Sequence, residues 1–220
     1  MIINNNGNSL SDIDLPLDGY PKGLIIAVSA PSGTGKTTLC NMLTKEFADI
    51  KPSISFTTRQ KRTGEIDDVS YHFINDEEFD KMVANGEFIE WANVFGKRYG
   101  TAYKSISCNN AGHLNDTLLE IDVQGVEKLI KYFKDKEDSG RLVTIFITPP
   151  AHNDLIDRLK KRGEMSSEEL KIRYEVSYVE LKKSNIYDYI ITNDVLDKAY
   201  LKLKSIIIAA RCRNIKKYKI

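Results

Sequence analysis

The sequence predicts an α/β fold in which a parallel sheet core is flanked by helices and carries an α+β insert and a small helical lid. Short apolar runs alternate with helical patterns along most of the 220 residues. A glycine-rich turn follows the first apolar run directly, and one stretch, 53–103, breaks the alternation with short, aromatic, turn-rich segments.

The core elements follow in chain order. Residues 23–30, "GLIIAVSA", are apolar and rich in β-branched side chains, which predicts a strand, and "KTTLCNMLTKEF" then places apolar residues at helical spacing. Buried strands are predicted at 116–123 and 141–150, and a shorter one at 187–194 ends at an Asn-Asp helix start. A long helix with a basic end is predicted over 197–219. The core therefore comprises 21–54, 104–157 and 177–220.

Three segments lie outside this alternation. The α+β insert covers 55–103 and contains one helical segment, "DEEFDKMVANG". Residues 158–176 are charged on most faces and predict a hinged helical lid. Residues 1–20 form a polar, acidic leader without the apolar region of a secretory signal, and we expect it to be disordered.

Composition excludes several functions. The formal net charge of +1 argues against dedicated binding to polymeric nucleic acid or to an anionic membrane. No stretch approaches about 18 uninterrupted apolar residues, so no membrane span is predicted. Three scattered cysteines and three dispersed histidines fit reduced thiols in the cytoplasm better than disulfides or a zinc site.

The glycine-rich turn "SAPSGTGKTTL" matches the P-loop pattern G-x-x-x-x-G-K-[ST] except that Ala30 occupies the first position. Gly33 and Gly35 allow backbone N–H groups to turn toward phosphate oxygens, at the positive end of the following helix. Lys36 would bridge the β- and γ-phosphates of a nucleotide. The alternative is a glycine turn with a chance Lys-Thr pair. The predicted ATP-binding residues of this loop are Ala30, Pro31, Ser32, Gly33, Thr34, Gly35, Lys36, Thr37 and Thr38.

A metal ion should accompany the phosphates. Mg²⁺ needs oxygen ligands, and a carboxylate at the end of a second strand usually contributes to its site. Glu120 and Asp122 are two residues apart in "LLEIDVQG" and therefore lie on the same side of a strand. The alternative is a strand end whose acids merely face solvent. We predict Thr37 and Glu120 as the metal site.

The phosphate acceptor is indicated by the insert. Arg59 and Arg62 flank the basic segment "RQKR" and suit forked contacts with a doubly charged phosphate. Glu90 lies among apolar residues in "GEFIEWANVFG", where a buried carboxylate needs donors. Guanine offers two adjacent donors, N1–H and the 2-amino group, whereas adenine does not. Glu90 therefore favours guanine. The aromatic residues Trp91 and Phe95 are interpreted as core of the insert.

With these motifs in order, the chain closely resembles guanylate kinase, a P-loop nucleoside monophosphate kinase. The resemblance runs from about Gly23 to Arg213 through "SAPSGTGKTTL", "SFTTRQKRTGE", "YHF", "GEFIEWANVFGKRYGT", "EIDVQG", "IFITPP", "RLKKRG" and "ITND". It implies Mg²⁺-dependent transfer of the γ-phosphate of ATP to GMP, giving ADP and GDP, in purine nucleotide metabolism and GMP recycling. It leaves open whether dGMP is also an acceptor and whether the chain is a monomer or a homo-oligomer.

The resemblance also assigns residues. It implies a GMP site of Ser55, Arg59, Arg62, Tyr71, Glu90, Tyr99, Thr101 and Asp122. It implies that catalysis involves Lys36, Arg59 and the lid arginines Arg158, Arg162 and Arg173. Glu120 stands where family members generally have Asp, so its direct contact with Mg²⁺ is an open question.

Some alternatives remain at this point. Asn193 matches the residue near the adenine of ATP, but a helix cap is a competing role. The lid arginines could belong to a solvated charged helix. As whole-protein alternatives we consider a catalytically inactive guanylate-kinase-like binding module, and a related P-loop kinase that acts on AMP or a ribose bisphosphate.

Overall fold

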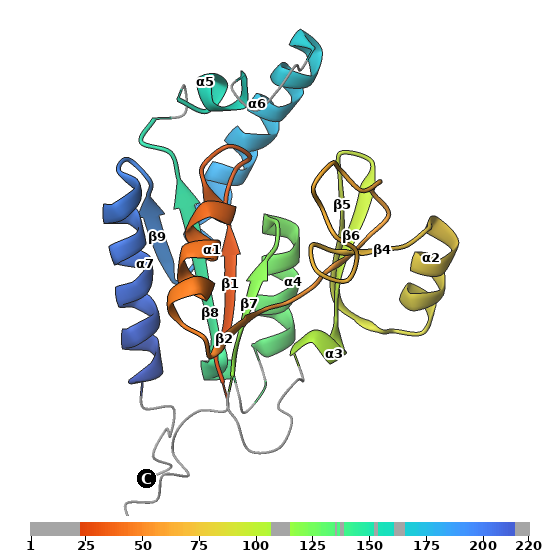
Figure 1. The fold of residues 1–220 in the computed structure, drawn as a ribbon, viewed down its shortest axis with the longest axis horizontal. Helices are drawn as coiled ribbons and strands as arrows, with labels where there is room; N and C mark the ends of the chain where they lie inside the picture. Colours follow the sequence, from red (N-terminus) through yellow and green to blue (C-terminus); the bar gives the residue numbers. More distant parts are fainter. Residues whose placement is uncertain are drawn as a thin grey trace, which may run out of the picture.

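A five-stranded sheet forms the centre of the fold, and all its neighbouring strands are parallel (Figure 1). The computed structural model describes residues 23–106, 115–134, 136, 139–151, 154–160 and 166–213. The strand order is β2 (Ile50–Pro52), β7 (Asp116–Glu120), β1 (Ile25–Ser29), β8 (Leu142–Thr148) and β9 (Tyr189–Thr192).

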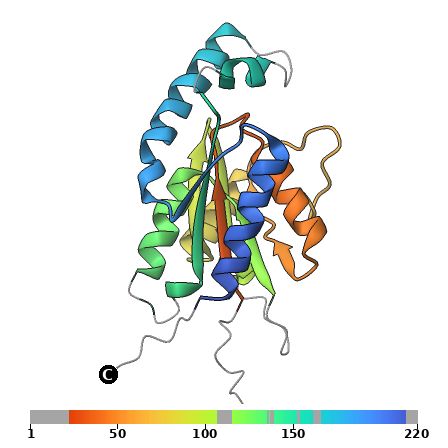
Figure 2. The same cartoon turned by 90° about the vertical axis from the view of Figure 1, so that its left-hand side faces the viewer.

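Helices cover both faces of this sheet, as Figure 2 shows. Helices α1 (Lys36–Glu46) and α7 (Leu196–Arg211) pack on one face, and α4 (Val123–Phe133) packs on the other. Because side chains alternate along a strand, Ile26 and Val28 of β1 join the first core while Ile25 and Ala27 join the second. Burial on both faces explains why the parallel strands are almost continuously apolar.

The insert folds around a second, smaller sheet with the order β4 (His72–Phe73), β3 (Phe56–Thr57), β6 (Lys97–Ala102) and β5 (Phe88–Val94). Helix α2 (Asp76–Ala84) packs Phe79 against this sheet, and Phe56 and Phe88 complete the small core. A reciprocal pair of hydrogen bonds between Asn75 and Glu78 caps the start of α2. The short helix α3 (Tyr103–Ile106) follows β6.

The lid region contains α5 (Asp154–Lys160) and α6 (Ser167–Lys182). Figures 1 and 2 show α5 and the first part of α6 above the edge of the sheet at which the parallel strands end. Short 3₁₀ segments, η3 (Ser139–Arg141) and η4 (Lys183–Ile186), precede β8 and β9. Among the described helices, none is both long enough and apolar enough to span a membrane.

The predicted fold class is confirmed, with differences at element boundaries. All four predicted core strands are present, but each is shorter than its apolar run. The C-terminal helix ends at Arg211 rather than continuing to 219, and the lid helix α6 extends beyond 176 to Lys182. The expected disordered leader, 1–20, lies outside the described residues.

Candidate active site

The turn after β1 has a backbone that only glycine adopts readily. Gly33 and Gly35 have φ values of 94° and 93°, in the left-handed region, and α1 starts directly after Gly35. A Cβ atom on Gly35 would also lie 2.6 Å from Nδ2 of Asn193. Both the turn geometry and this close approach therefore require glycine at position 35.

The P-loop is held in shape by buried hydrogen bonds. The Thr34 hydroxyl donates to the Pro31 carbonyl at 2.7 Å, and the Asn193 side-chain amide donates to the Thr34 carbonyl at 2.7 Å. Asn193 is buried, whereas the N-cap of α7 is Val195, which makes no side-chain capping bond. Asn193 thus stabilises the P-loop through its hydrogen bond to Thr34 and does not cap α7.

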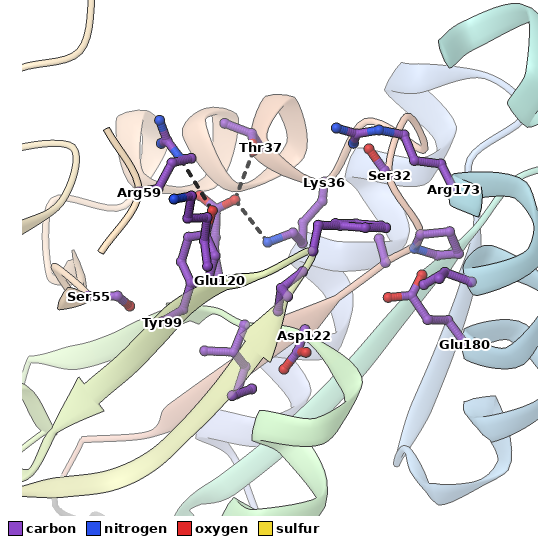
Figure 3. A pocket seen from close by; sticks show the side chains of 18 of the residues that line it. Ser32, Lys36, Thr37, Ser55, Arg59, Tyr99, Glu120, Asp122, Arg173 and Glu180 are labelled. Atoms are coloured by element: carbon purple, nitrogen blue, oxygen red, sulfur yellow. Dashed lines mark hydrogen bonds and ion pairs between the residues drawn. The ribbon is translucent and has the colours of Figure 1, made fainter. Parts of the chain in front are cut away.

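A cavity of about 500 Å³ opens between the P-loop, the insert and α6. Figure 3 shows residues from all three parts directed toward it. The sequence-predicted residues that line it are Ala30, Pro31, Ser32, Gly33, Gly35, Lys36, Thr37, Ser55, Arg59, Arg62, Tyr71, Glu90, Tyr99, Glu120, Asp122 and Arg173.

Two groups of the P-loop helix meet a carboxylate at the edge of the sheet. The Thr37 hydroxyl donates to Oε2 of Glu120 at 2.9 Å, and the Lys36 ammonium lies 3.4 Å from the same oxygen (Figure 3). Parallel pairing of β1 with β7 sets Val28 beside Glu120 and so delivers this carboxylate to the loop. Mg²⁺ bound to a nucleotide commonly takes a hydroxyl oxygen and a carboxylate oxygen of the protein as ligands, so Thr37 and Glu120 fit this ion.

Asp122 plays a different structural role from Glu120. The strand β7 ends at Glu120, and Asp122 is the N-cap of α4, where its Oδ1 accepts from the Gly125 N–H at 2.9 Å. Burial raises the pKa of the Asp122 carboxyl above its ordinary value. The two acids therefore line one cavity, but not as neighbours on one strand face.

Glu90 is a buried carboxylate on β5, only 5% exposed. Its Oε1 accepts a 2.6 Å hydrogen bond from the hydroxyl of Thr101, which lies opposite it on β6. The register between β5 and β6 shifts between Phe88 and Glu90, an irregularity of the kind that re-aims a side chain. Burial raises the pKa of Glu90 to about 7.

A carboxylate that the sequence analysis missed, Glu65, holds the side chain of Arg59 and the backbone of Arg62. Glu65 receives two hydrogen bonds from the guanidinium of Arg59, at 3.0 and 2.7 Å, and one from the backbone N–H of Arg62 at 2.8 Å. Arg59 also donates to the Tyr99 hydroxyl at 3.2 Å and lies over the Tyr71 ring. The signal was present in "RQKRTGE", where the acid follows both arginines at short spacing.

The lid arginines differ in their placement. The guanidinium of Arg158 donates to the backbone carbonyl of Asn193 at 3.2 Å and so contacts the residue that holds the P-loop. Arg173 lines the cavity, and Arg162 lies outside the described residues. Thr34, Thr38 and Arg158 are not among the residues that line the cavity.

Helix α6 supplies further lining residues that the sequence did not single out. Glu169, Val176 and Glu180 share the cavity-facing side of the helix with Arg173. Burial, with Asp122 nearby, raises the pKa of Glu180 to about 7. These residues occur at helical spacing in a charged segment, so nothing local distinguishes them from a solvated face.

Trp91 and Phe95 have different environments. Trp91 packs against the small core of the insert, as predicted. The prediction for Phe95 was wrong, because this residue is 48% exposed in the turn between β5 and β6 and lines the cavity. From sequence alone, an aromatic residue in an apolar stretch looks like a core residue. Only the position of the hairpin turn, known from the structure, shows that Phe95 is exposed.

Comparisons with known proteins agree with this geometry. The sequence model of the family described as guanylate kinase matches residues 22–210. The chain is 44% identical to a guanylate kinase of Caldanaerobacter subterraneus over 87% of this chain and 90% of that protein. It is 41% identical to one of Geobacter metallireducens over 89% and 93%, respectively.

A solved structure extends the likeness to three dimensions. The crystal structure of guanylate kinase from Anaplasma phagocytophilum is 31% identical, superposes with a TM-score of 0.72, and covers 89% of this chain and 90% of that one. Sequence and structure together match nearly the whole length that carries the cavity. The chain belongs to the guanylate kinase family.

Proposed function

We propose that this protein is a guanylate kinase that transfers the γ-phosphate of ATP to GMP and so forms ADP and GDP. One observation carries the proposal: a P-loop lysine and a buried carboxylate on the insert, Lys36 and Glu90, line the same cavity. If the P-loop holds the phosphates of ATP and Glu90 holds the guanine of GMP, the γ-phosphate of ATP and the phosphate of GMP would face each other within the cavity.

On the ATP side, the loop around Gly33 and Gly35 turns backbone N–H groups toward the phosphate chain. Lys36 lies beside Glu120 and can move to the β- and γ-phosphate oxygens. Asn193 contributes by holding the loop through Thr34 and would thus act on ATP indirectly.

Thr37 and Glu120 would hold Mg²⁺ together with phosphate oxygens. When bound, the ion neutralises charge that develops on the phosphoryl group being transferred. Glu120, whose carboxylate already accepts from Thr37, would supply the carboxylate ligand of this site.

On the acceptor side, Glu90 would accept hydrogen bonds from N1–H and the 2-amino group of guanine, with Asp122 near the same end. Arg59 and Arg62 would bind the doubly charged phosphate, helped by the hydroxyls of Tyr71 and Tyr99. Ser55 lines the same wall, and Thr101 acts through Glu90.

The transfer itself needs positioning and charge neutralisation more than a protein base. The nucleophile is an oxygen of the GMP phosphate, whose second pKa is about 6, so it is largely ionised at neutral pH. Lys36 of α1 and Arg173 of α6 both line the cavity and would neutralise negative charge on the phosphoryl group being transferred. Closure of the lid, 158–176, over the core and the 55–103 insert would exclude water.

The discriminating experiment is a coupled assay of ADP formation with GMP, dGMP, AMP, CMP or UMP as acceptor. We expect GMP to be strongly preferred to AMP and the pyrimidine nucleotides, and removal of Mg²⁺ by a chelator to abolish turnover. Equal turnover with GMP and AMP would contradict guanine selection by Glu90. Tight GMP binding without any ADP formation would indicate a non-catalytic binding module instead.

A further inference from the structure

The hairpin that joins β5 to β6 has an uncommon residue at its tip. Phe95 and Gly96 connect Val94 to Lys97, which are paired across the two strands. Both connecting residues have positive φ, 52° and 74°. A two-residue turn with this backbone favours Asn or Asp followed by Gly, and a bulky side chain at positive φ is rare. The phenylalanine is therefore not explained by the turn.

The Phe95 side chain contacts another part of the molecule. Its ring is 48% exposed and lines the cavity, and the guanidinium carbon of Arg173 lies 5.0 Å from the ring centre. Arg173 belongs to α6, whereas Phe95 belongs to the insert. This cation–π contact thus bridges two of the three parts that enclose the cavity, the insert and α6.

The choice of an aromatic partner has a chemical consequence. Glu169 and Glu180 line the cavity from the same helix as Arg173, yet none of the ion pairs found within the described residues joins Arg173 to a carboxylate. A carboxylate would occupy the guanidinium donors and offset the charge. A ring contacts the face of the guanidinium and leaves its in-plane N–H donors available for phosphate oxygens.

We propose that Phe95 is a positioning residue that holds the guanidinium of Arg173 at the cavity, with its donors free, and ties the tip of the insert to the lid helix. This inference rests on the proposed phosphoryl transfer. Phe95 itself performs no chemistry and acts through Arg173.

The first test is kinetic. Phe95→Leu removes the aromatic face but keeps an apolar side chain, and we expect kcat to fall about two- to fivefold, the range of an exposed cation–π contact, with little change in the KM for ATP. Phe95→Tyr keeps the ring and should retain wild-type kcat. In an Arg173→Met background, Phe95→Leu should have no further effect, since both changes remove one contact.

Phe95→Asn separates positioning from stability. Asn is favoured at this turn position, so the variant should keep or raise the melting temperature while its kcat falls as in Phe95→Leu. The matched control is Tyr178→Leu, which removes a partly exposed aromatic ring that contacts Lys182 within α6 and is not among the residues that line the cavity. Its kcat should stay at the wild-type value.

The contact is also measurable without turnover. In the ligand-free protein, the ring of Phe95 should shift the NMR signal of the Arg173 Nε–H, and Phe95→Leu should remove this shift while Tyr178→Leu leaves it. An unchanged Arg173 signal in Phe95→Leu, or losses in kcat that simply multiply in the double variant, overturns the proposal. Wild-type protein that fails to phosphorylate GMP would contradict the proposed function instead, and the NMR measurement would still decide the contact.

Discussion

The two walls of the cavity are built on different principles. On the ATP side, the phosphate-binding surface is mainly backbone, shaped by Gly33 and Gly35 and fastened by Asn193. On the acceptor side, the surface is made of side chains such as Arg59 and Glu90, carried on a small sheet with its own core. The first wall thus depends on backbone conformation at two glycines and on a few side chains such as Asn193, whereas the second depends mainly on individual side chains.

The difference matters for recognition. A phosphate chain is the same in every nucleoside triphosphate, and inward-facing N–H groups suffice to bind it. To select one base, the protein needs side-chain hydrogen-bonding groups that match that base and that other residues already hold in position. Glu90 is held by Thr101, and Arg59 by Glu65, before any ligand arrives. Changes on the two walls should therefore produce different kinetic signatures.

The largest effect should come from Lys36→Ala. Loss of this charge removes a group aimed at the transferring phosphoryl, so we expect kcat to fall about 100- to 1000-fold. Because Lys36 is partly exposed, the circular-dichroism spectrum and melting temperature should stay close to wild type. Lys45→Ala, on the exposed side of α1, is the control. A collapsed spectrum in Lys36→Ala would show a structural role instead.

Glu90→Gln should act on the acceptor wall alone. The amide directs a donor at one of the guanine donors, so kcat/KM for GMP should fall about 10- to 100-fold, in line with about 1.5–3 kcal/mol for a charged hydrogen bond. The KM for ATP should not change. Glu87→Gln, at an exposed position just before β5, is the matched control. Survival of the GMP-over-AMP ratio in Glu90→Gln would refute the assignment.

Asn193→Ala should affect the opposite wall. It removes a buried donor from the Thr34 carbonyl and should lower the free energy of unfolding by about 1–3 kcal/mol. The loosened loop should raise the KM for ATP and leave the KM for GMP within twofold. Asn185→Ala, at an exposed position in η4, serves as the comparison. Equal changes in both KM values would mean that the walls are not independent.

A pH series should give the smallest effect. The pKa of Glu90 is raised to about 7, so the carboxyl is neutral below that pH and cannot accept both guanine donors. The KM for GMP should rise about fourfold between pH 8 and pH 6.5, as the ionised fraction falls from about 0.9 to about 0.25. Glu90→Gln should lose this dependence and keep only that of the GMP phosphate. Identical profiles for the two proteins would count against a titrating Glu90.

The same shift predicts a stability change in the ligand-free protein. Because the folded chain keeps the Glu90 proton up to about pH 7, while the unfolded chain loses it near 4.5, stability should fall as pH rises through this window. Glu180, whose pKa is also raised to about 7, acts in the same direction. Glu90→Gln should flatten the curve in part, as measured by denaturant unfolding between pH 5 and 8.

Much of this protein follows from local sequence. The apolar runs, the glycine turn and the spacing of Leu39 and Leu43 predict strand, loop and helix because those signals lie within a few residues of one another. The P-loop pattern, together with the expected carboxylate at the end of a second strand, likewise predicted Thr37 and Glu120 as one metal site, and the structure places the two side chains within hydrogen-bonding distance.

Tertiary structure decided the partners that are distant in sequence. Asn193 meets Thr34 across 159 positions, Glu90 meets Thr101 through an irregular strand register, and Phe95 meets Arg173 across the cavity. No local sequence pattern predicts these contacts, because they depend on how the strands align and the helices pack in the folded chain. Periodicity along the chain reports which face of an element is apolar, whereas only packing determines what that face and its polar neighbours touch.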